Sequence, residues 1–134
     1  MNEVYLDYNG SAPLDPRVAE AMLPVLTGGF GNASSVHRFG QRQAAAVDEA
    51  REHVAALVGG KPSGVVFTAG ATEANNLALR GAVEASPVSR PRLLISAVEH
   101  ASVRQTASYL NEQGIAKVDV VPVTSGGYVD LDAL

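Results

Sequence analysis

The sequence predicts an α/β fold in which helices cover a mostly parallel β-sheet. Three short apolar runs, at residues 65–67, 93–96 and 118–121, are bounded like buried strands. Helical patterns lie between them, the second over residues 102–113. Alternating strands and helices are joined by right-handed crossovers into a parallel sheet. A length of 134 residues is enough for one hydrophobic core.

Two helices are expected before the first of these strands. Asp15 is a helix cap followed by proline at the first helical position, which predicts a helix from Pro16 toward Leu26 that Pro24 should bend. A loop over residues 32–35 leads into a longer helix that ends at the glycine pair 59–60. Apolar residues recur along it at helical spacing: Val47, Ala50, Val54, Leu57 and Val58. His37 and Arg38, at its start, either reach a site or anchor the loop.

Residues 65–76 join an apolar strand, a small-residue turn and a helix that starts with polar residues. The first backbone N–H groups of a helix lack intrahelical partners and carry partial positive charge, so they bind anions. Gly70 and Ala71 allow close approach, and Thr72 adds a hydroxyl donor. Neither a dinucleotide fingerprint nor a P-loop lysine is present, so the expected ligand is a simpler phosphate. The alternative is a turn glycine with Thr72 as a plain helix cap.

His100 follows the strand at residues 93–96, at the sheet edge where open α/β folds bind ligands. An imidazole there can stack on a planar ring, transfer a proton, or only cap the following helix. Gly114 should end that helix, and Asp130 should cap another one close to the end of the chain. The three or four residues that follow this cap cannot form a stable helix. We therefore expect the fold to be truncated at its C-terminal end and its sheet to be incomplete.

Composition excludes several functional classes. The chain is 46% hydrophobic and 18% charged with a formal net charge of −4, and its lysines and arginines do not cluster, which argues against nucleic-acid binding. No apolar stretch approaches about 20 residues, and Met1–Glu3 do not begin a leader, so we expect a cytoplasmic protein with no membrane contact. The absence of cysteine rules out a persulfide or disulfide on these residues. No metal site is expected.

Four segments in this order resemble the cysteine desulfurases, pyridoxal-phosphate enzymes of the class V aminotransferase type. They cover nearly the whole chain: residues 5–16 (YLDYNGSAPLDP), 30–40 (FGNASSVHRFG), 66–76 (VFTAGATEANN) and 99–100 (EH). The resemblance implies the amino-terminal portion of a fold type I transferase. Residues 1–35 would contribute to its small domain and residues 36–134 to its large cofactor-binding domain.

The resemblance also implies roles for individual residues. Ala71, through its backbone, and Thr72, through backbone and hydroxyl, would hold the phosphate of pyridoxal 5'-phosphate. His100 would stack on the pyridine ring and assist proton transfer. The implied reaction moves sulfur from L-cysteine to an enzyme persulfide and releases alanine. The complete enzyme would be a homodimer that passes sulfur to an acceptor protein, for iron–sulfur cluster biogenesis or another sulfur-transfer pathway.

Several catalytic groups of that family would lie further along: the cofactor-holding lysine, an aspartate at the pyridine nitrogen, the persulfide cysteine and a substrate-binding arginine. The only lysines here, Lys61 and Lys117, lie outside a Ser-x-His-Lys context. We therefore expect these 134 residues alone to be inactive. The alternatives are another class V aminotransferase, a selenocysteine lyase, or a noncatalytic phosphate-ligand or protein-binding module.

Overall fold

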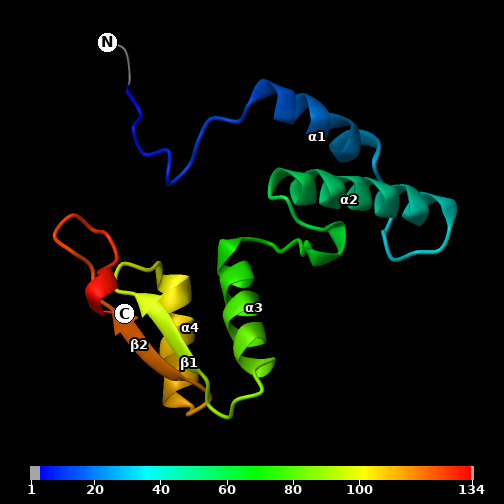
Figure 1. The fold of residues 1–134 in the computed structure, drawn as a ribbon. Coiled ribbons are helices and arrows are strands. Elements are labelled where there is room, and N and C mark those ends of the chain that lie inside the picture. The colour runs from blue at the N-terminus through cyan, green and yellow to red at the C-terminus, as the bar shows by residue number, and fades with distance from the viewer. Residues whose placement is uncertain (1–3, 134) are drawn as a thin grey trace. The chain divides into compact units, whose positions relative to one another are not determined.

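The computed structural model describes residues 4–133 and divides the chain into two compact units, Met1–Val65 and Val66–Leu134 (Figure 1). Met1–Glu3, on which the absence of a leader was argued, lie outside the described residues, as does Leu134. The domain boundary expected near residue 35 concerns the full-length enzyme and stays a prediction. No helix in the described part of the chain is long and apolar enough to cross a membrane.

The first unit begins with helix α1 (Pro16–Gly28), whose start is as predicted. Asp15 Oδ1 accepts a hydrogen bond from the Arg17 N–H at 2.8 Å, and the two side chains form an ion pair at 2.6 Å. Pro24 lies inside the helix, which continues two residues beyond the expected end before Gly29 caps it. No residue of α1 is buried.

Helix α2 (Arg38–Leu57) starts at a histidine cap. His37 Nδ1 accepts a hydrogen bond from the Gly40 N–H at 3.2 Å, which supports the loop-anchoring alternative for this residue. A Cβ on Gly40 would lie 2.6 Å from the Asn32 carbonyl oxygen, so only glycine lets this loop approach the helix. Gly59, with φ +65°, ends the helix as predicted, and the 3₁₀ helix η1 (Pro62–Gly64) packs against α2.

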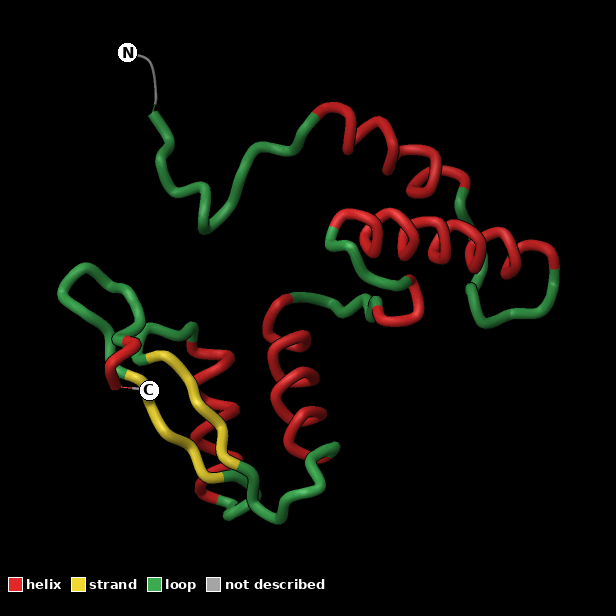
Figure 2. The backbone as a smooth tube through the Cα atoms, viewed as in Figure 1, coloured by secondary structure: helices red, strands yellow, loops and turns green. Residues whose placement is uncertain are grey.

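The second unit contains α3 (Ala71–Glu84), β1 (Arg92–Ser96), α4 (Ala101–Glu112) and β2 (Lys117–Val121). The two strands lie side by side (Figure 2) and pair in parallel, as predicted. Their register runs from Arg92 opposite Lys117 to Ser96 opposite Val121. Helix α4 packs against both strands and α3 packs against α4 (Figure 1). A small core lies between them, made of Val83, Leu93, Leu110 and Ala116. This is the predicted α/β arrangement of a parallel sheet and helices.

One predicted strand is wrong. Residues 65–67 pair with no strand among residues 4–133, although Val65 has extended dihedrals of −91° and 124°. A β-strand needs a neighbour to satisfy its backbone groups, and here the Arg51 guanidinium donates to the Val65 carbonyl instead.

The expected cap at Asp130 is present, because Asp130 Oδ1 accepts from the Asp132 N–H at 3.1 Å at the start of the 3₁₀ helix η2 (Leu131–Ala133).

Candidate functional site

The expected phosphate seat is the N-terminus of α3. Gly70 is the N-cap residue, and no side chain caps this helix end. Ala71 and Thr72 occupy the first two helical positions, where backbone N–H groups have no intrahelical acceptor. The alternative interpretation of Thr72 as a plain helix cap is therefore wrong, because the N-cap of α3 is Gly70, two residues earlier. Its hydroxyl remains an additional donor beside the two exposed N–H groups.

The turn before α3 is held by the acid of the first helical turn. Glu73 Oε2 accepts a hydrogen bond from the Ala69 N–H at 2.7 Å. Gly70 has a φ of 169°, an extended value open to any residue, and a Cβ added there would meet no atom within 4 Å. There is thus open space beside the Gly70 Cα. An anion has both donors and room at this helix end.

His100 is the N-cap of α4, directly after the sheet edge where β1 ends. Its Nδ1 accepts a hydrogen bond from the Ser102 N–H at 3.1 Å and lies 2.9 Å from Ser102 Oγ. The capping alternative is therefore present in the structure. It occupies only Nδ1, and the residue is exposed, so ring stacking and proton transfer at Nε2 remain open to it.

Side-chain hydrogen bonds bring these two helix starts together. Asn75 Nδ2 donates to Ser102 Oγ at 2.9 Å, and Thr106 Oγ1 donates to Asn76 Oδ1 at 2.9 Å. The first bond joins the second turn of α3 to the first turn of α4, and the other joins the two helices about one turn farther along α4. The bond between Asn75 and Ser102 therefore holds the expected phosphate seat at residues 71–72 and His100 close to the same contact between α3 and α4. Only His100 follows a paired strand, because residues 65–67 have no strand partner in the described part of the chain.

A polar groove of about 350 Å³ runs between the two helices from this edge. Arg80 lies over the ring of Tyr109 at 5.5 Å farther along it. The groove is lined by Thr72, Asn76, Arg80, Ser102, Gln105, Thr106 and Tyr109. Asn76 bridges it by donating to the Thr72 carbonyl and accepting from Thr106, and its lining contains no carboxylate.

Sequence reasoning missed the residues that join the helices. Ser102 and Thr106 are each only 7% exposed, although they are polar. Their spacing of four residues puts them on one face of α4, close to the buried residues Ala107 and Leu110. Two hydroxyls on the apolar face of a helix need hydrogen-bond partners. The two amide side chains at residues 75–76 of the preceding helix are the feature of the sequence that could have indicated those partners.

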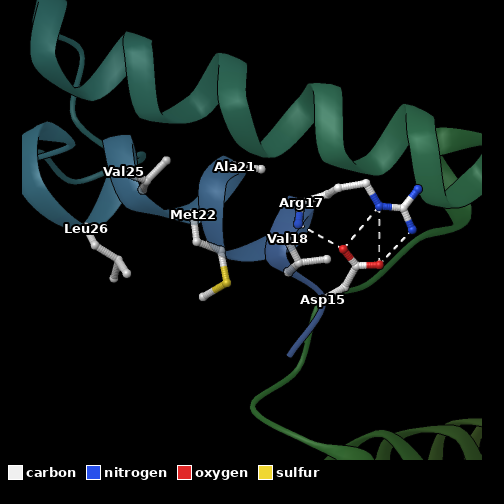
Figure 3. Close-up of a pocket in the computed structure, with 7 residues that line it drawn as sticks. All are labelled: Asp15, Arg17, Val18, Ala21, Met22, Val25 and Leu26. Carbon is white, nitrogen blue, oxygen red and sulfur yellow. Dashed lines mark hydrogen bonds and ion pairs between the residues drawn. The ribbon is translucent and has the colours of Figure 1, made fainter. Parts of the chain in front are cut away.

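Another hollow lies on α1, in the first unit. It measures about 540 Å³ and is formed by one side of α1 and its cap (Figure 3). Figure 3 shows Val18, Met22 and Leu26 along that side and the Asp15–Arg17 pair at its end. The pair is internally satisfied and the rest is aliphatic, so this surface has no group for acid–base or nucleophilic chemistry.

One ion pair joins the two strands of the sheet. The Arg92 guanidinium hydrogen-bonds Asp119 across the two strands and lowers the pKa of that carboxyl below its ordinary value of 3.8. Lys117 opens β2 beside Arg92, at the opposite end from Ser96 and the His100 edge. Residues 4–133 contain no group of three or more histidines, aspartates or glutamates placed to hold a metal ion.

Comparisons with known proteins agree with this arrangement. A family model described as aminotransferase class-V matches residues 4–134. The chain is 44% identical over 128 residues to the cysteine desulfurase IscS 1 of Archaeoglobus fulgidus, covering 96% of this chain and 33% of that protein. The chain therefore spans about a third of the length of the curated relatives it matches.

Solved structures give the same result. A NifS-like protein superposes with a TM-score of 0.89 at 35% identity, over 97% of this chain and 35% of its own. The structure named SspA in complex with cysteine superposes with a TM-score of 0.78, also at 35% identity, over 88% of this chain and 34% of its own.

Proposed function

The chain belongs to the aminotransferase class-V family, and on that premise we propose that it is the amino-terminal part of a pyridoxal-phosphate cysteine desulfurase. The observation that carries the proposal is the hydrogen bond from Asn75 to Ser102, because it holds the phosphate seat and His100 close to the same contact between α3 and α4. The relatives named cysteine desulfurase and the relative in complex with cysteine support L-cysteine as the substrate.

The residues present fit the phosphate of pyridoxal 5'-phosphate. Two N–H groups without acceptors, a hydroxyl with no capping role and open space over Gly70 form a donor set for a dianion. Ala71 would bind through its backbone and Thr72 through backbone and hydroxyl. When bound, the cofactor supplies an electron sink for the substrate carbon atoms, and the protein supplies orientation and electrostatics.

His100 has two tasks in this proposal. Its ring would stack on the planar cofactor and fix its tilt, since the imidazole is anchored through Nδ1 to the first turn of α4. Its exposed Nε2 would exchange the proton that must move between the substrate and its surroundings. These roles use one residue as platform and as acid–base group.

The chain has no cysteine, so the sulfur-accepting cysteine would come from the part of the protein outside these residues. The cofactor-holding lysine would come from there too. A homodimeric enzyme in the cytoplasm that passes sulfur to an acceptor protein for iron–sulfur clusters or another pathway is the form we propose for the whole protein, on the strength of its family resemblance.

The test is to supply the full-length protein with pyridoxal phosphate and L-cysteine and to measure alanine and sulfide in the presence of a thiol reductant. Equal amounts of both products are expected. Alanine from L-selenocysteine alone would favour a selenocysteine lyase. Conversion of an amino acid to its keto acid without sulfide would favour a class V aminotransferase. Binding of phosphate ligands with no turnover would favour the noncatalytic module.

A further inference from the structure

Ser102 links an amide of one helix to the imidazole at the start of the next. Asn75 Nδ2 lies 2.9 Å from Ser102 Oγ, and the same oxygen lies 2.9 Å from His100 Nδ1. Ser102 is 7% exposed, whereas His100 is exposed. The chain of hydrogen bonds therefore runs from the α3–α4 contact outward to the ring at the surface.

The direction of these bonds determines where the imidazole carries its proton. The Asn75 amide donates to Ser102 Oγ, which leaves the Ser102 hydroxyl hydrogen free to point at His100 Nδ1. The Ser102 backbone N–H also donates to Nδ1, at 3.1 Å. A ring nitrogen that accepts hydrogen bonds carries no hydrogen, so the neutral imidazole has its proton on Nε2.

We propose that Asn75 and Ser102 are positioning residues that hold His100 in the Nε2–H tautomer and make Nε2 the nitrogen at which it exchanges protons. The role of Nε2 in catalysis rests on the proposed function, whereas the Nε2–H tautomer of His100 follows from the hydrogen bonds alone. If Nδ1 took up a proton, the first turn of α4 would lose its cap and a hydrogen would face the Ser102 N–H. The anchored nitrogen is thereby kept out of proton exchange.

A second bridge provides a built-in control. Thr106 Oγ1 donates to Asn76 Oδ1 at 2.9 Å, so Asn76 joins the same two helices one residue away. Thr106 also lies 2.8 Å from the Ser102 carbonyl oxygen but has no hydrogen bond to the His100 ring. A change at Asn76 thus perturbs the helix contact without entering the path to the imidazole.

The decisive variant is Asn75→Asp, with Asn76→Asp as its matched control. A carboxylate at position 75 would accept the Ser102 hydroxyl hydrogen, so that Ser102 Oγ would present lone pairs to Nδ1. This reversal should raise the fraction of His100 with a hydrogen on Nδ1 by about two- to tenfold, the range expected for one hydrogen bond. Asn76→Asp adds the same charge, preserves an acceptor for Thr106, and should leave the ring unchanged.

The measurement is long-range ¹H–¹⁵N NMR of the cofactor-free full-length protein labelled at its histidine imidazoles. The spectra are recorded in alkaline buffer, which favours the neutral form of imidazole side chains. The His100 signals are those lost in His100→Gln. The wild-type protein should show the Nε2–H pattern. A wild-type Nδ1–H pattern, or equal responses to the two aspartate variants, would overturn the proposal.

Turnover separates this inference from the proposed function. Ser102→Ala preserves the backbone cap and removes the hydroxyl, so kcat for alanine release should fall while KM for L-cysteine changes little. Ser108→Ala removes an exposed hydroxyl from the same helix, where it lies 2.8 Å from Glu112 Oε1, and should leave kcat unchanged. If the NMR pattern holds and no cysteine-dependent alanine forms, the proposed function fails and the positioning of His100 stands. If turnover is normal and Ser102→Ala does not lower kcat, the positioning role fails and the function stands.

Discussion

Glu73 Oε2 accepts a hydrogen bond from the Ala69 backbone N–H at 2.7 Å, so an acid of the first turn of α3 closes the turn that precedes it. Between these two residues lie Gly70, Ala71 and Thr72, which carry the N–H groups of the proposed phosphate seat. The carboxylate also stabilises the positive end of the helix dipole. Glu73 therefore has a geometric effect on the seat and an electrostatic effect that opposes an incoming anion.

Two variants separate these effects. Glu73→Gln preserves an acceptor for Ala69 and removes the negative charge, so the affinity for pyridoxal phosphate should stay the same or rise. Glu73→Ala removes both, so the turn loosens and affinity should fall below that of Glu73→Gln. Calorimetric titration of the cofactor-free full-length protein measures both. Equal affinities in the two variants would show that the bond to Ala69 does not shape the seat.

Thr72→Ala should lower cofactor affinity about ten- to hundredfold. A hydrogen bond to a charged group contributes roughly 1.5–3 kcal/mol, and the backbone donors would remain. Folding should be unaffected, because the N-cap is Gly70 and the Thr72 hydroxyl caps nothing. Thr72→Ser is the control, since it keeps the hydroxyl and should bind almost as the wild type does. Unchanged affinity in Thr72→Ala would show that the hydroxyl does not bind the cofactor phosphate.

Much of the fold could be predicted because local signals coincide with the final contacts. Asp15 followed by proline, the glycines at 59 and 114, and the apolar runs of the two strands act over a few residues and need little tertiary context. The strand predicted at residues 65–67 is wrong for the opposite reason. Its β-branched composition favours a strand, but the described residues place no partner strand beside it, and hydrogen bonding along a strand is set by the neighbour.

The candidate site likewise has one part that local sequence signals locate and another part that they do not. Helix N-termini can be located from sequence, so the seat at residues 71–72 and the position of His100 at a helix start were accessible. The contacts from Asn75 to Ser102 and from Asn76 to Thr106 span 27 and 30 residues, and no short-range pattern specifies such pairs. Only the unusual burial of two hydroxyls on α4 reveals that partners are required.

The ion pair between Arg92 and Asp119 predicts a weak acid sensitivity of the second unit. Arg92 lowers the pKa of the Asp119 carboxyl in the folded protein below its ordinary 3.8, so the pair stabilises the fold above that pH. The contribution disappears as pH falls through the lower, folded-state pKa. Asp119→Asn should therefore reduce stability slightly at pH 6 and less at pH 2, when urea unfolding is followed at both. A loss that is equal at both pH values would assign the effect to packing.

Neither lysine of this chain should bind the cofactor covalently. Lys117 begins β2 and the site lies beyond the other end of the sheet, about 13 Å away along a five-residue strand. Lys61 precedes the proline of η1 and lies outside any Ser-x-His-Lys context. When the 134-residue chain is treated with pyridoxal phosphate and borohydride, mass spectrometry should find no stoichiometric adduct. A stoichiometric adduct on either lysine that survives prior dialysis would contradict this.

Variants of His100 can distinguish a catalytic role from a structural one, because His100 caps α4 through Nδ1 and leaves Nε2 outside the cap. Asparagine is a good N-cap, so His100→Asn should keep stability close to wild type while losing the ring and the titratable Nε2. General acid–base assistance typically contributes about 10²–10⁴-fold, so alanine formation by the full-length enzyme should fall at least a hundredfold and the bound-cofactor spectrum should shift.

His100→Ala completes the comparison. It removes the cap as well, so the free energy of unfolding should fall by about 0.5–2 kcal/mol relative to His100→Asn. Turnover in the two variants should be similarly low, because both lack the imidazole. If His100→Asn retained near-normal turnover and a normal cofactor spectrum, the residue would be a helix cap alone. If both variants lost turnover only in proportion to unfolding, measured by circular dichroism under assay conditions, the proton-transfer role would be rejected as well.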